Sequence, residues 1–406
     1  MPSKTNLTFL CISSYQKGEA FIQSCKEAGN TVYLLTGKRL EHDWPREYLD
    51  DIFFVEEIEK GIWNLEEVKA GLAHLMKSVK IDRLIALDDF DVEKASYLRE
   101  HFRIPGMGQT TSRYFRDKLA MRIKAQESGI NVPAFSQVFN DHEVNQYADT
   151  VEAPYVLKPR FEASATGIKK VHSKKELWQA IHETGDERHN CLVEQFRPGS
   201  VYHVDTLTID GKVVFTQVSQ YLNPPFDVAH GGGIFQSASV EYGSDDDVAL
   251  RKLNEQVLKS FGMQFSASHT EFIKSNDSGE FFFLETSSRV GGAHLAEMVE
   301  AASGLNLWAE WARIETAKAL GSKYKLPKVR KEYAGIVVSL SKYQHPDDSQ
   351  FSDEEIVWRL NKDYHIGLII KSQSRDRIQE LLDKYARIIQ NEYHASAPAP
   401  KKSSEG

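Results

Sequence analysis

The first hundred residues alternate short apolar runs with segments whose apolar positions recur every three to four residues. The apolar runs predict β-strands and the periodic segments predict amphipathic helices. In chain order these are strand 7–13, helix 19–28, strand 31–36, helix 65–79, strand 82–87 and helix 92–102. Short strands that alternate with helices indicate a parallel sheet covered on both faces, whose ligands lie at the carboxyl ends of the strands.

Those strand ends carry polar residues, including Asp88 and Asp89, although ordinary loop polarity explains the two aspartates equally well. The first strand is not followed by a GxGxxG pattern, so the fingerprint of a dinucleotide-binding site is absent. The sequence therefore predicts a Rossmann-like sheet without a nicotinamide site.

The pattern changes after a boundary near 106–113. A helix is predicted at 114–128, a small α/β stretch at 134–196, and long antiparallel strands at 202–209 and 212–220. The chain is therefore predicted to be α/β (α+β) in class and to have four parts. These are an N-terminal α/β domain at 1–112, a central domain at 113–330 that includes the small region 134–196, a C-terminal α/β subdomain at 331–394, and a disordered, Pro-rich tail at 395–406.

Composition narrows the class of protein. A net charge of −8 argues against a nucleic-acid partner, which would require a basic face. The three cysteines form no CxxC pair, and the chain shows neither a signal peptide nor an apolar run long enough to span a membrane. We therefore expect a cytoplasmic protein that binds neither nucleic acid nor membrane.

A lysine lies on an apolar strand ahead of a loop of small residues. Lys158 ends the run Tyr155–Lys158, and a buried ammonium requires a counter-charge. The small residues 163–167 follow, and the backbone N–H groups of such a loop can close over phosphates. The P-loop pattern GxxxxGK[ST] is absent. A phosphate site and a chance combination both fit this stretch when it is taken alone.

Two glutamates form a second candidate site. Glu271 and Glu285 lie in apolar runs that a short turn makes antiparallel neighbours. Such like charges repel each other unless a cation lies between them, and Mg²⁺ typically takes one or two carboxylates together with phosphate oxygens. The alternative is that each glutamate pairs separately with a lysine or arginine on a solvated face. The apolar flanks favour the metal interpretation.

The residues after Glu285 suggest a substrate site. Arg289 presents a planar fork that suits a carboxylate or a phosphoryl oxygen, and Gly291 and Gly292 allow a ligand to approach the backbone. A turn with an exposed arginine is the alternative.

A Gly-rich segment at 231–233 is predicted to be a mobile loop on the substrate side, although a plain turn explains it equally well. Asp227, His230 and His269 are candidates for binding or deprotonating an amine.

The order of these parts resembles the ATP-grasp superfamily, most closely its carboxylate–amine ligases, including L-amino acid ligases, and its biotin-carboxylase-like members. The motifs are VLKP, the small-residue loop, LVEQF, TEF and FLETSSR, and the resemblance extends upstream to Arg116–Lys118 and downstream into the last unit. It covers nearly the whole chain. It implies an ATP-grasp architecture with an N-terminal Rossmann-like sheet, a small lid at 134–196 and an antiparallel C-terminal part.

The resemblance also implies a role for each matching residue. Lys118 and Lys158 would bind the ATP phosphates under the loop of Ser164, Thr166 and Gly167, and Glu194 with the backbone of Gln195 and Phe196 would bind adenine. Glu271 and Glu285 would bind Mg²⁺. The acyl phosphate or substrate would be oriented by Arg289, Gly291, Gly292 and His230.

Three departures from the family pattern affect this assignment. Ser287 stands where an asparagine metal ligand is usual, so one metal site is expected to be weaker. Val201 replaces a glutamate that contacts the ribose in the family. His203 matches a ribose-contacting histidine of the carboxylase branch, and the alternative for His203 is a strand histidine that faces solvent. The run Gly291–His294 replaces the bicarbonate and biotin motif of the carboxylases.

The predicted function is an ATP-dependent ligase that uses Mg²⁺, with Mn²⁺ as a possible substitute. It activates a small-molecule carboxylate as an acyl phosphate and joins it to an amine, with a dipeptide as the preferred product. A biotin-carboxylase-like enzyme and a non-catalytic nucleotide-binding module are the alternatives. A homodimer is the assembly considered beside a monomer.

Overall fold

The structure, a computed structural model, describes residues 6–163, 166–226, 228 and 232–396. Its first sheet is parallel, with the strand order β3-β2-β1-β6. The elements of this region are β1 (Thr8–Ser13), α1 (Glu19–Glu27), β2 (Thr31–Gly37), β3 (Asp51–Val55), β4 (Glu57–Glu59), β5 (Ile62–Trp63), α2 (Leu65–Leu75), β6 (Arg83–Ala86) and α3 (Val92–Phe102). The predicted parallel sheet is confirmed. The apolar pattern does not predict β3, and α2 ends four residues earlier than its pattern suggests.

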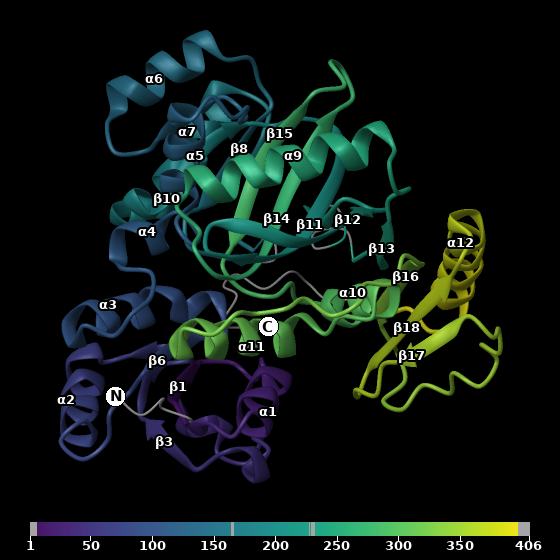
Figure 1. The fold of residues 1–406 in the computed structure, drawn as a ribbon. Helices are drawn as coiled ribbons and strands as arrows, with labels where there is room; N and C mark the ends of the chain where they lie inside the picture. The colour runs from purple at the N-terminus through teal and green to yellow at the C-terminus, as the bar shows by residue number, and fades with distance from the viewer. Residues whose placement is uncertain (1–5, 164–165, 227, 229–231, 397–406) are drawn as a thin grey trace.

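A second layer covers this parallel sheet. Helix α11 (Leu307–Leu320) packs against α1, where the rings of Phe21 and Trp311 lie 4.9 Å apart. Figure 1 shows α11 between the N-terminal sheet and the larger sheet above it. The segment that follows β6 reaches the central part of the molecule, where Asp89 pairs with Arg289.

Two helices connect the first sheet to the next. These are α4 (Gln109–Arg113) and α5 (Lys118–Glu127), where one helix over 114–128 is predicted. The difference arises at Asp117, whose carboxylate accepts the backbone N–H groups of Leu119 and Ala120 and so begins a new helix. This cap fixes Lys118 at the first position of α5.

A small antiparallel sheet follows, with the strand order β7-β10-β8-β9. Its elements are β7 (Phe135–Gln137), α6 (Asp141–Thr150), β8 (Tyr155–Pro159), β9 (Lys169–Val171), α7 (Lys174–Thr184) and β10 (Cys191–Gln195). Both helices pack on one face of this sheet through a separate apolar cluster that includes Val144, Leu177 and Val193. This region has its own core, as expected of a lid.

The largest sheet is antiparallel, with the strand order β15-β14-β11-β12-β13-β16-β18-β17. Its strands are β11 (Gly199–Ile209), β12 (Lys212–Tyr221), β13 (Phe235–Ser239), β14 (Ser266–Ser275), β15 (Phe281–Ser287), β16 (Tyr333–Leu340), β17 (Ile356–Arg359) and β18 (His365–Ser372). The pattern predicts the longer strands but not the short β13 and β17.

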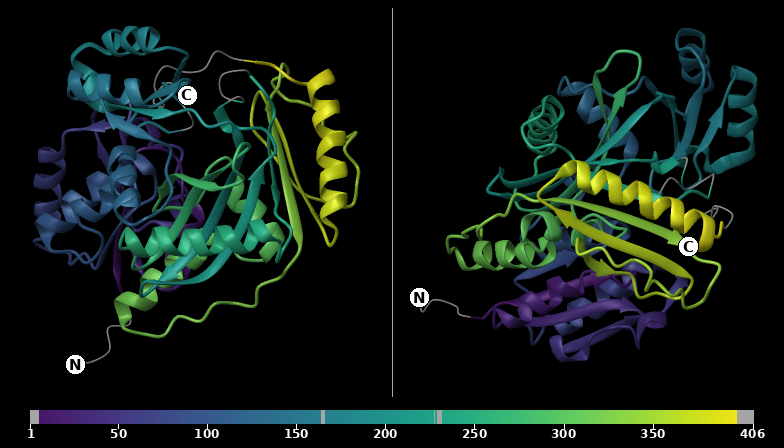
Figure 2. Two further views of the ribbon diagram at one scale, coloured as in Figure 1. Left: turned by 90° about the horizontal axis from the view of Figure 1, so that it is seen from above. Right: turned by 90° about the vertical axis from the view of Figure 1, so that its right-hand side faces the viewer.

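Helices cover the two faces of this sheet unequally. One face packs against α9 (Asp245–Ser260) and α12 (Arg375–Glu392), and the opposite face packs in part against α10 (Leu295–Ser303). Figure 2 shows α12 lying along the outer side of the last strands. A Cβ at Gly335 would lie 2.7 Å from side-chain atoms of Ile378 and Leu382, so glycine allows α12 to approach β16 closely.

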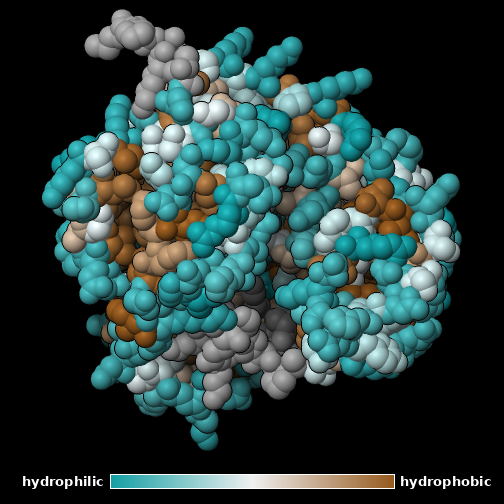
Figure 3. Space-filling view, turned by 90° about the horizontal axis from the view of Figure 1, so that it is seen from below, coloured by the Kyte–Doolittle hydropathy of each residue, from teal (hydrophilic) through white to brown (hydrophobic). Residues whose placement is uncertain are grey.

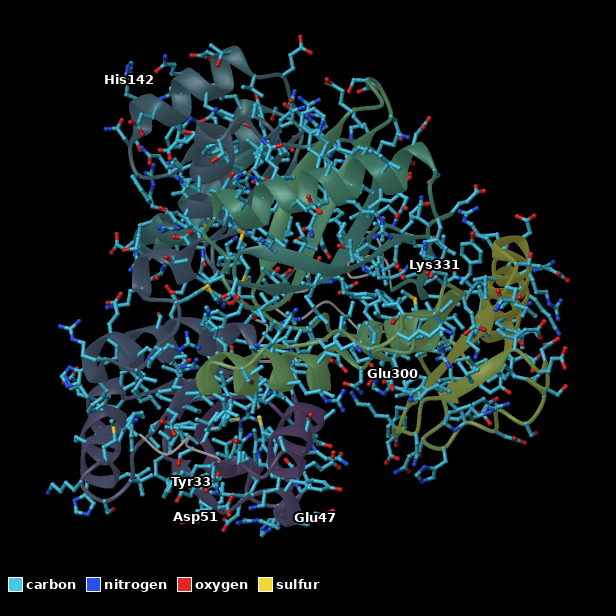
Figure 4. All side chains as sticks on the ribbon, in the orientation of Figure 1. Tyr33, Glu47, Asp51, His142, Glu300 and Lys331 are labelled. Carbon is cyan, nitrogen blue, oxygen red and sulfur yellow. The ribbon has the colours of Figure 1, made fainter. Side chains whose placement is uncertain are left out.

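The strands of the last unit continue the same sheet, because β13 pairs with β16 across the boundary drawn at residue 331. The four-part division therefore remains a prediction. The chain passes from the helices α10 and α11 to this part of the sheet between Glu300 and Lys331, which Figure 4 labels. Most of the tail, 397–406, lies outside the described residues, whereas Ala395 donates a backbone hydrogen bond to Leu340.

Hydrophobic residues on the face seen from below occur as separate groups among hydrophilic ones (Figure 3). Every helix among the described residues is too short or too polar to cross a lipid bilayer.

Candidate active site

A cleft with a volume of ≈ 700 Å³ lies between the small sheet, the large sheet and the end of β6. It is large enough for a nucleotide and a small substrate. Most of the residues predicted for the site line this cleft. They are Lys118, Lys158, Thr166, Glu194, Gln195, Phe196, Glu271, Glu285, Ser287, Arg289 and Gly292. Residues from positions 118 to 292 therefore converge on one cavity.

Lys158 lies on β8 inside a buried group of charges. Its Nζ is 2.6 Å from one oxygen of Glu194 on β10, and Nε of Arg122 is 2.5 Å from the other oxygen. Burial lowers the pKa of Lys158 to about 8, although Glu194 opposes the shift. The counter-charge expected for a strand lysine is thus Glu194, and the two cations around it leave a local excess of positive charge.

Lys118 approaches the cleft from the start of α5. Its Nζ lies 2.8 Å from Oε2 of Glu285 and donates a 2.7 Å hydrogen bond to the carbonyl of Glu162. Burial would raise the pKa of Glu285, but Lys118, Lys158 and Arg122 together lower it to about 2. Glu285 is therefore ionised at neutral pH.

Glu271 and Glu285 lie directly opposite each other on β14 and β15, as predicted. Tyr221 donates a 2.8 Å hydrogen bond to Oε1 of Glu271, and Nε2 of His269 lies 3.5 Å from the same oxygen. The alternative was that each glutamate pairs with a lysine or arginine on a solvated face. Among the described residues only Glu285 has such a partner, Lys118, and both carboxylates line the cleft. A β-bulge follows Glu271 at the point where the two strands change register.

A chain of hydrogen bonds continues behind Glu271. Both oxygens of Asp205 accept hydrogen bonds, one from Nδ1 of His269 and one from Nδ1 of His203, each at 2.8 Å. Burial would lower the pKa of His269, but Asp205 and Glu271 raise it to about 10, so this ring is protonated at neutral pH. The side chains of His203, Asp205 and His269 also lie close enough together to hold a metal ion, although the Nδ1 atoms of both histidines are already hydrogen-bonded to Asp205.

The structure corrects the ribose assignment of His203. The side chain is fully buried, its Nε2 lies 2.7 Å from Oγ of Ser237, and it is not among the described residues that line the cleft. The solvent-facing alternative is also wrong. Residues 201–208 of β11 are all buried, so this stretch exposes neither face to solvent.

The adenine assignment also changes in part. The backbone N–H groups of Gln195 and Phe196 already donate to the carbonyls of Ala134 and Pro154 at 2.8 and 2.9 Å. They are therefore not available as donors to a nucleotide without the loss of these bonds. The side chains of the two residues still line the cleft.

Ser287 carries an unsatisfied polar atom. Its Oγ is buried and has no hydrogen-bond partner among the described residues. It lines the cleft with Glu271 and Glu285, and Ser287 pairs with His269 in the register of β14 and β15. An oxygen without a partner beside two carboxylates is a donor set that suits a hard divalent cation. The residues present therefore fit a magnesium site.

Arg289 is fixed by a partner from the other end of the chain. Its guanidinium forms an ion pair with Asp89, at the carboxyl end of β6, and donates a 2.6 Å hydrogen bond to the carbonyl of Val290. The alternative of an exposed arginine is therefore wrong. Burial would raise the pKa of Asp89, but Arg289, Arg116 and Lys17 lower it. Oδ1 of Asp89 has no hydrogen-bond partner among the described residues.

The glycines predicted for the site differ in position. Gly292 lines the cleft, whereas Gly167 and Gly291 are not among its described lining residues. A Cβ at Gly291 would lie 2.9 Å from Nδ1 of His269 and 3.0 Å from Oδ1 of Asp205. This glycine therefore makes room for the His269–Asp205 pair rather than for a ligand. Ser164, Asp227 and His230 lie outside the described residues.

Sequence reasoning missed several residues near the site. Arg122, Asp205 and Tyr221 carry no motif, and each acts through a partner far away in sequence. The signal available for Asp205 was its position on the predicted strand 202–209, whereas Tyr221 directly follows the predicted strand 212–220.

Comparisons with known proteins agree with this geometry. The family model described as the D-ala D-ala ligase C-terminus matches residues 125–223. The L-arginine-specific L-amino acid ligase of Bacillus subtilis is 24% identical over 300 residues, which cover 71% of this chain and 70% of that protein.

Two solved structures have the same fold. The L-amino acid ligase from Bacillus licheniformis aligns with a TM-score of 0.75 at 17% identity and covers 97% of this chain and 99% of that one. The biotin carboxylase domain of the 2-oxoglutarate carboxylase from Hydrogenobacter thermophilus, in complex with MgADP, ADP and bicarbonate, aligns with a TM-score of 0.70 at 15% identity and covers 96% and 90%.

Taken with the site, these similarities support the resemblance to ATP-grasp carboxylate–amine ligases. They support the prediction of an ADP-forming ligase that makes carbon–nitrogen bonds. The predicted fold class and the predicted class of reaction are both confirmed.

Proposed function

We propose that this enzyme joins two amino acids into a dipeptide through an acyl phosphate. The observation that carries the proposal is the convergence of Glu271, Glu285, Lys118, Lys158 and Arg289 on one cleft. Such a cleft can neutralise a triphosphate at one end and hold a carboxylate beside its terminal phosphate. The names of the two amino acid ligases among its relatives support the choice of substrate.

In this proposal the ATP phosphates lie between Lys118 and Lys158. Glu194 holds Lys158 in place, and Thr166 lines the same end of the cleft. Closure of the region 134–196 over the cleft would exclude water, which matters because an acyl phosphate hydrolyses readily.

Mg²⁺ would be held by Glu271 and Glu285 with Ser287 as a third oxygen donor, and Mn²⁺ would fit the same oxygens. When bound, it would shield the phosphate charge and so favour attack by an anion. Lys118 now neutralises Glu285, so this lysine would be free to turn towards the phosphates once the metal takes over that charge.

The proposed reaction has two steps. A carboxylate oxygen of the first amino acid attacks the γ-phosphorus, the bond from that phosphorus to the β–γ bridging oxygen breaks, and ADP leaves. The amine of the second amino acid then attacks the acyl carbon, loses a proton and displaces inorganic phosphate. Arg289, held by Asp89, would orient the carboxylate and stabilise the oxyanion of the second step.

We also propose that the enzyme is located in the cytoplasm. All three cysteines are buried free thiols, and burial raises the pKa of each of them. This state suits the reducing cytoplasm, where small-molecule amino acids and ATP are available.

The proposal is tested by measuring ADP and phosphate release over pairs of amino acids, with the dipeptide identified by mass spectrometry. We expect release that depends on both amino acids and on Mg²⁺, and a fall of about 10²-fold or more in Glu285→Ala. Glu280→Ala, on the exposed turn of the same hairpin, is the matched control. Release with bicarbonate alone, or full turnover by Glu285→Ala, would contradict the proposal.

A further inference from the structure

A second cavity, with a volume of ≈ 360 Å³, lies where the N-terminal sheet meets the central part of the chain. Its walls come from β6, α3, α4 and the segment before it, the start of β14, and α11 (Figure 1 labels these elements). The exposed residues Gly106 and Gln264 also line it, so a solute can enter. The cavity and the cleft share no described lining residue, but Ser288 of the cavity lies between Ser287 and Arg289 of the cleft.

Arg83 of β6 has an unsatisfied donor at the wall of this cavity. Its side chain is only 7% exposed and lies between two other lining residues, the ring of Phe265 and the carboxylate of Glu315. Nε of Arg83 is 3.4 Å from Oε2 of Glu315, and neither atom has a hydrogen-bond partner among the described residues. The two groups attract each other without forming a hydrogen bond, so both atoms remain available to a third group.

Arg99 of α3 adds a second buried cation. Its Nε donates a 2.8 Å hydrogen bond to the carbonyl of Leu84, and its Nη1 donates a 3.2 Å hydrogen bond to the carbonyl of Met107. These bonds fix the guanidinium in place, but neutral carbonyls do not cancel its charge. Burial lowers the pKa of Arg99 to about 10, although Glu315 opposes the shift, so the group stays protonated at neutral pH.

Cations outnumber carboxylates at this cavity. Glu315 is the one acidic residue among the described residues that line it, and this carboxylate also accepts a 3.2 Å hydrogen bond from Nε1 of Trp311. Lys318 lines the cavity as well, but it pairs with Asp210 at the surface. Because a buried cation without a counter-charge is costly, the second arginine leaves one positive charge to be matched.

A purely structural cluster of ions is the alternative explanation. Such a cluster is expected to be packed, with each charge hydrogen-bonded to its neighbour. Here a cavity lies beside the charges, and a buried donor and a buried acceptor lack partners. Guanidinium groups present planar forks that match the paired oxygens of a carboxylate or a phosphate. The excess of positive charge therefore favours an anion over a neutral or cationic ligand.

We propose that this cavity is a second ligand site, separate from the cleft, in which Arg83 and Arg99 bind a small oxyanion through its carboxylate or phosphate group. Glu315 limits the affinity of the site because its carboxylate competes for the same two arginines. A bound oxyanion would bridge the N-terminal domain and the central part of the chain, and it would stabilise the folded protein.

The test is calorimetric titration of the full chain with inorganic phosphate and, separately, with malonate. Both titrations include Mg²⁺ and an excess of a non-hydrolysable ATP analogue, which occupies the phosphate-binding end of the cleft. We expect at least one anion to bind and to raise the unfolding temperature. Tighter binding of phosphate would identify a phosphate ligand, and tighter binding of malonate would identify a carboxylate ligand. If neither anion bound at millimolar concentration, the proposal would be wrong.

Two substitutions in the cavity should have opposite effects on the affinity for the anion. Arg83→Gln removes a partner of the anion and should weaken binding by about tenfold or more. Glu315→Gln removes the competing carboxylate and should strengthen binding by about threefold or more. An anion bound in the cleft would respond to neither change. The same affinity in the native protein and in both variants would therefore overturn the assignment.

Arg113→Gln is the matched control, because Arg113 is exposed on α4 and lines neither cavity. It should leave the affinity unchanged. Thermal unfolding without an anion shows whether each variant is folded, and Glu315→Gln keeps the test decisive if Arg83→Gln does not fold. An equal loss of affinity in Arg113→Gln and Arg83→Gln would mean that the anion responds only to the overall charge, which would contradict a built site.

Discussion

The proposed nucleotide end of the cleft and the apolar end opposite it are built from different parts of the fold. Lys158, Glu194 and Glu285 lie on regular strands, and each has an ion-pair partner within 2.8 Å. The apolar end is lined by Tyr221, Phe235 and Leu295, and the turn before α10 contains strained backbone at Ala293 and His294. The charges of the cleft are thus held by ion pairs on regular strands, whereas part of the apolar end lies on a turn, where sequences tolerate change.

This division predicts that variants of the nucleotide end affect every substrate equally, and the largest effect is expected at Lys158. Lys158→Met removes a cation from the phosphates and leaves Glu194 with Arg122 as its partner. We expect ADP release to fall by about 10²-fold or more, independently of the amino acid supplied.

The measurement is steady-state ADP release with three different amino acids, together with a binding titration for ATP. Lys169→Met is the control, since Lys169 lies on the same small sheet but pairs with Glu183 at the surface. A loss that depended strongly on the amino acid would break the distinction between the two ends.

A smaller effect on activity is expected at Asp89, where the two ends of the cleft meet. Asp89→Asn weakens the ion pair that fixes Arg289, so the guanidinium would hold the substrate carboxylate less well. We expect the KM for the amino acid to rise by about tenfold while the KM for ATP stays nearly constant. Asp51→Asn, on the edge strand of the same parallel sheet, serves as the control (Figure 4 labels Asp51). An increase confined to the KM for ATP would assign Asp89 to the nucleotide instead.

The sequence predicts the nucleotide end better than the substrate end, for a physical reason. Periodicity determines strands and helices, and a short turn fixes which strands pair, so Glu271 and Glu285 could be placed opposite each other. The contact between Asp89 and Arg289 joins residues 200 positions apart, and no local pattern encodes it. His203 was misassigned because an antiparallel strand is expected to expose one face, whereas residues 201–208 of β11 are all buried.

The pH dependence of ATP binding gives a finer test of the nucleotide end. Lys158 carries its charge below its pKa of about 8 and loses it as the pH rises through that value. Between pH 7 and 8.5 the protonated fraction falls about fourfold, and the affinity for ATP should fall with it. Calorimetric titration of ATP across this range tests the prediction. Lys158→Arg should flatten the profile, because a guanidinium stays protonated, and an unchanged profile in that variant would implicate another group.

The smallest effect on catalysis is expected at His203, where the structure overturns the assignment made from sequence. The ring bridges Asp205 and Ser237 and does not reach the cleft. His203→Gln should therefore leave the KM for ATP within about twofold. It should lower the unfolding temperature, because the loss of buried hydrogen bonds costs about 1–3 kcal/mol. Both quantities can be measured on one preparation, by ADP release and by calorimetry. A KM for ATP raised tenfold, with the unfolding temperature unchanged, would return His203 to the nucleotide and would extend the nucleotide end behind Tyr221.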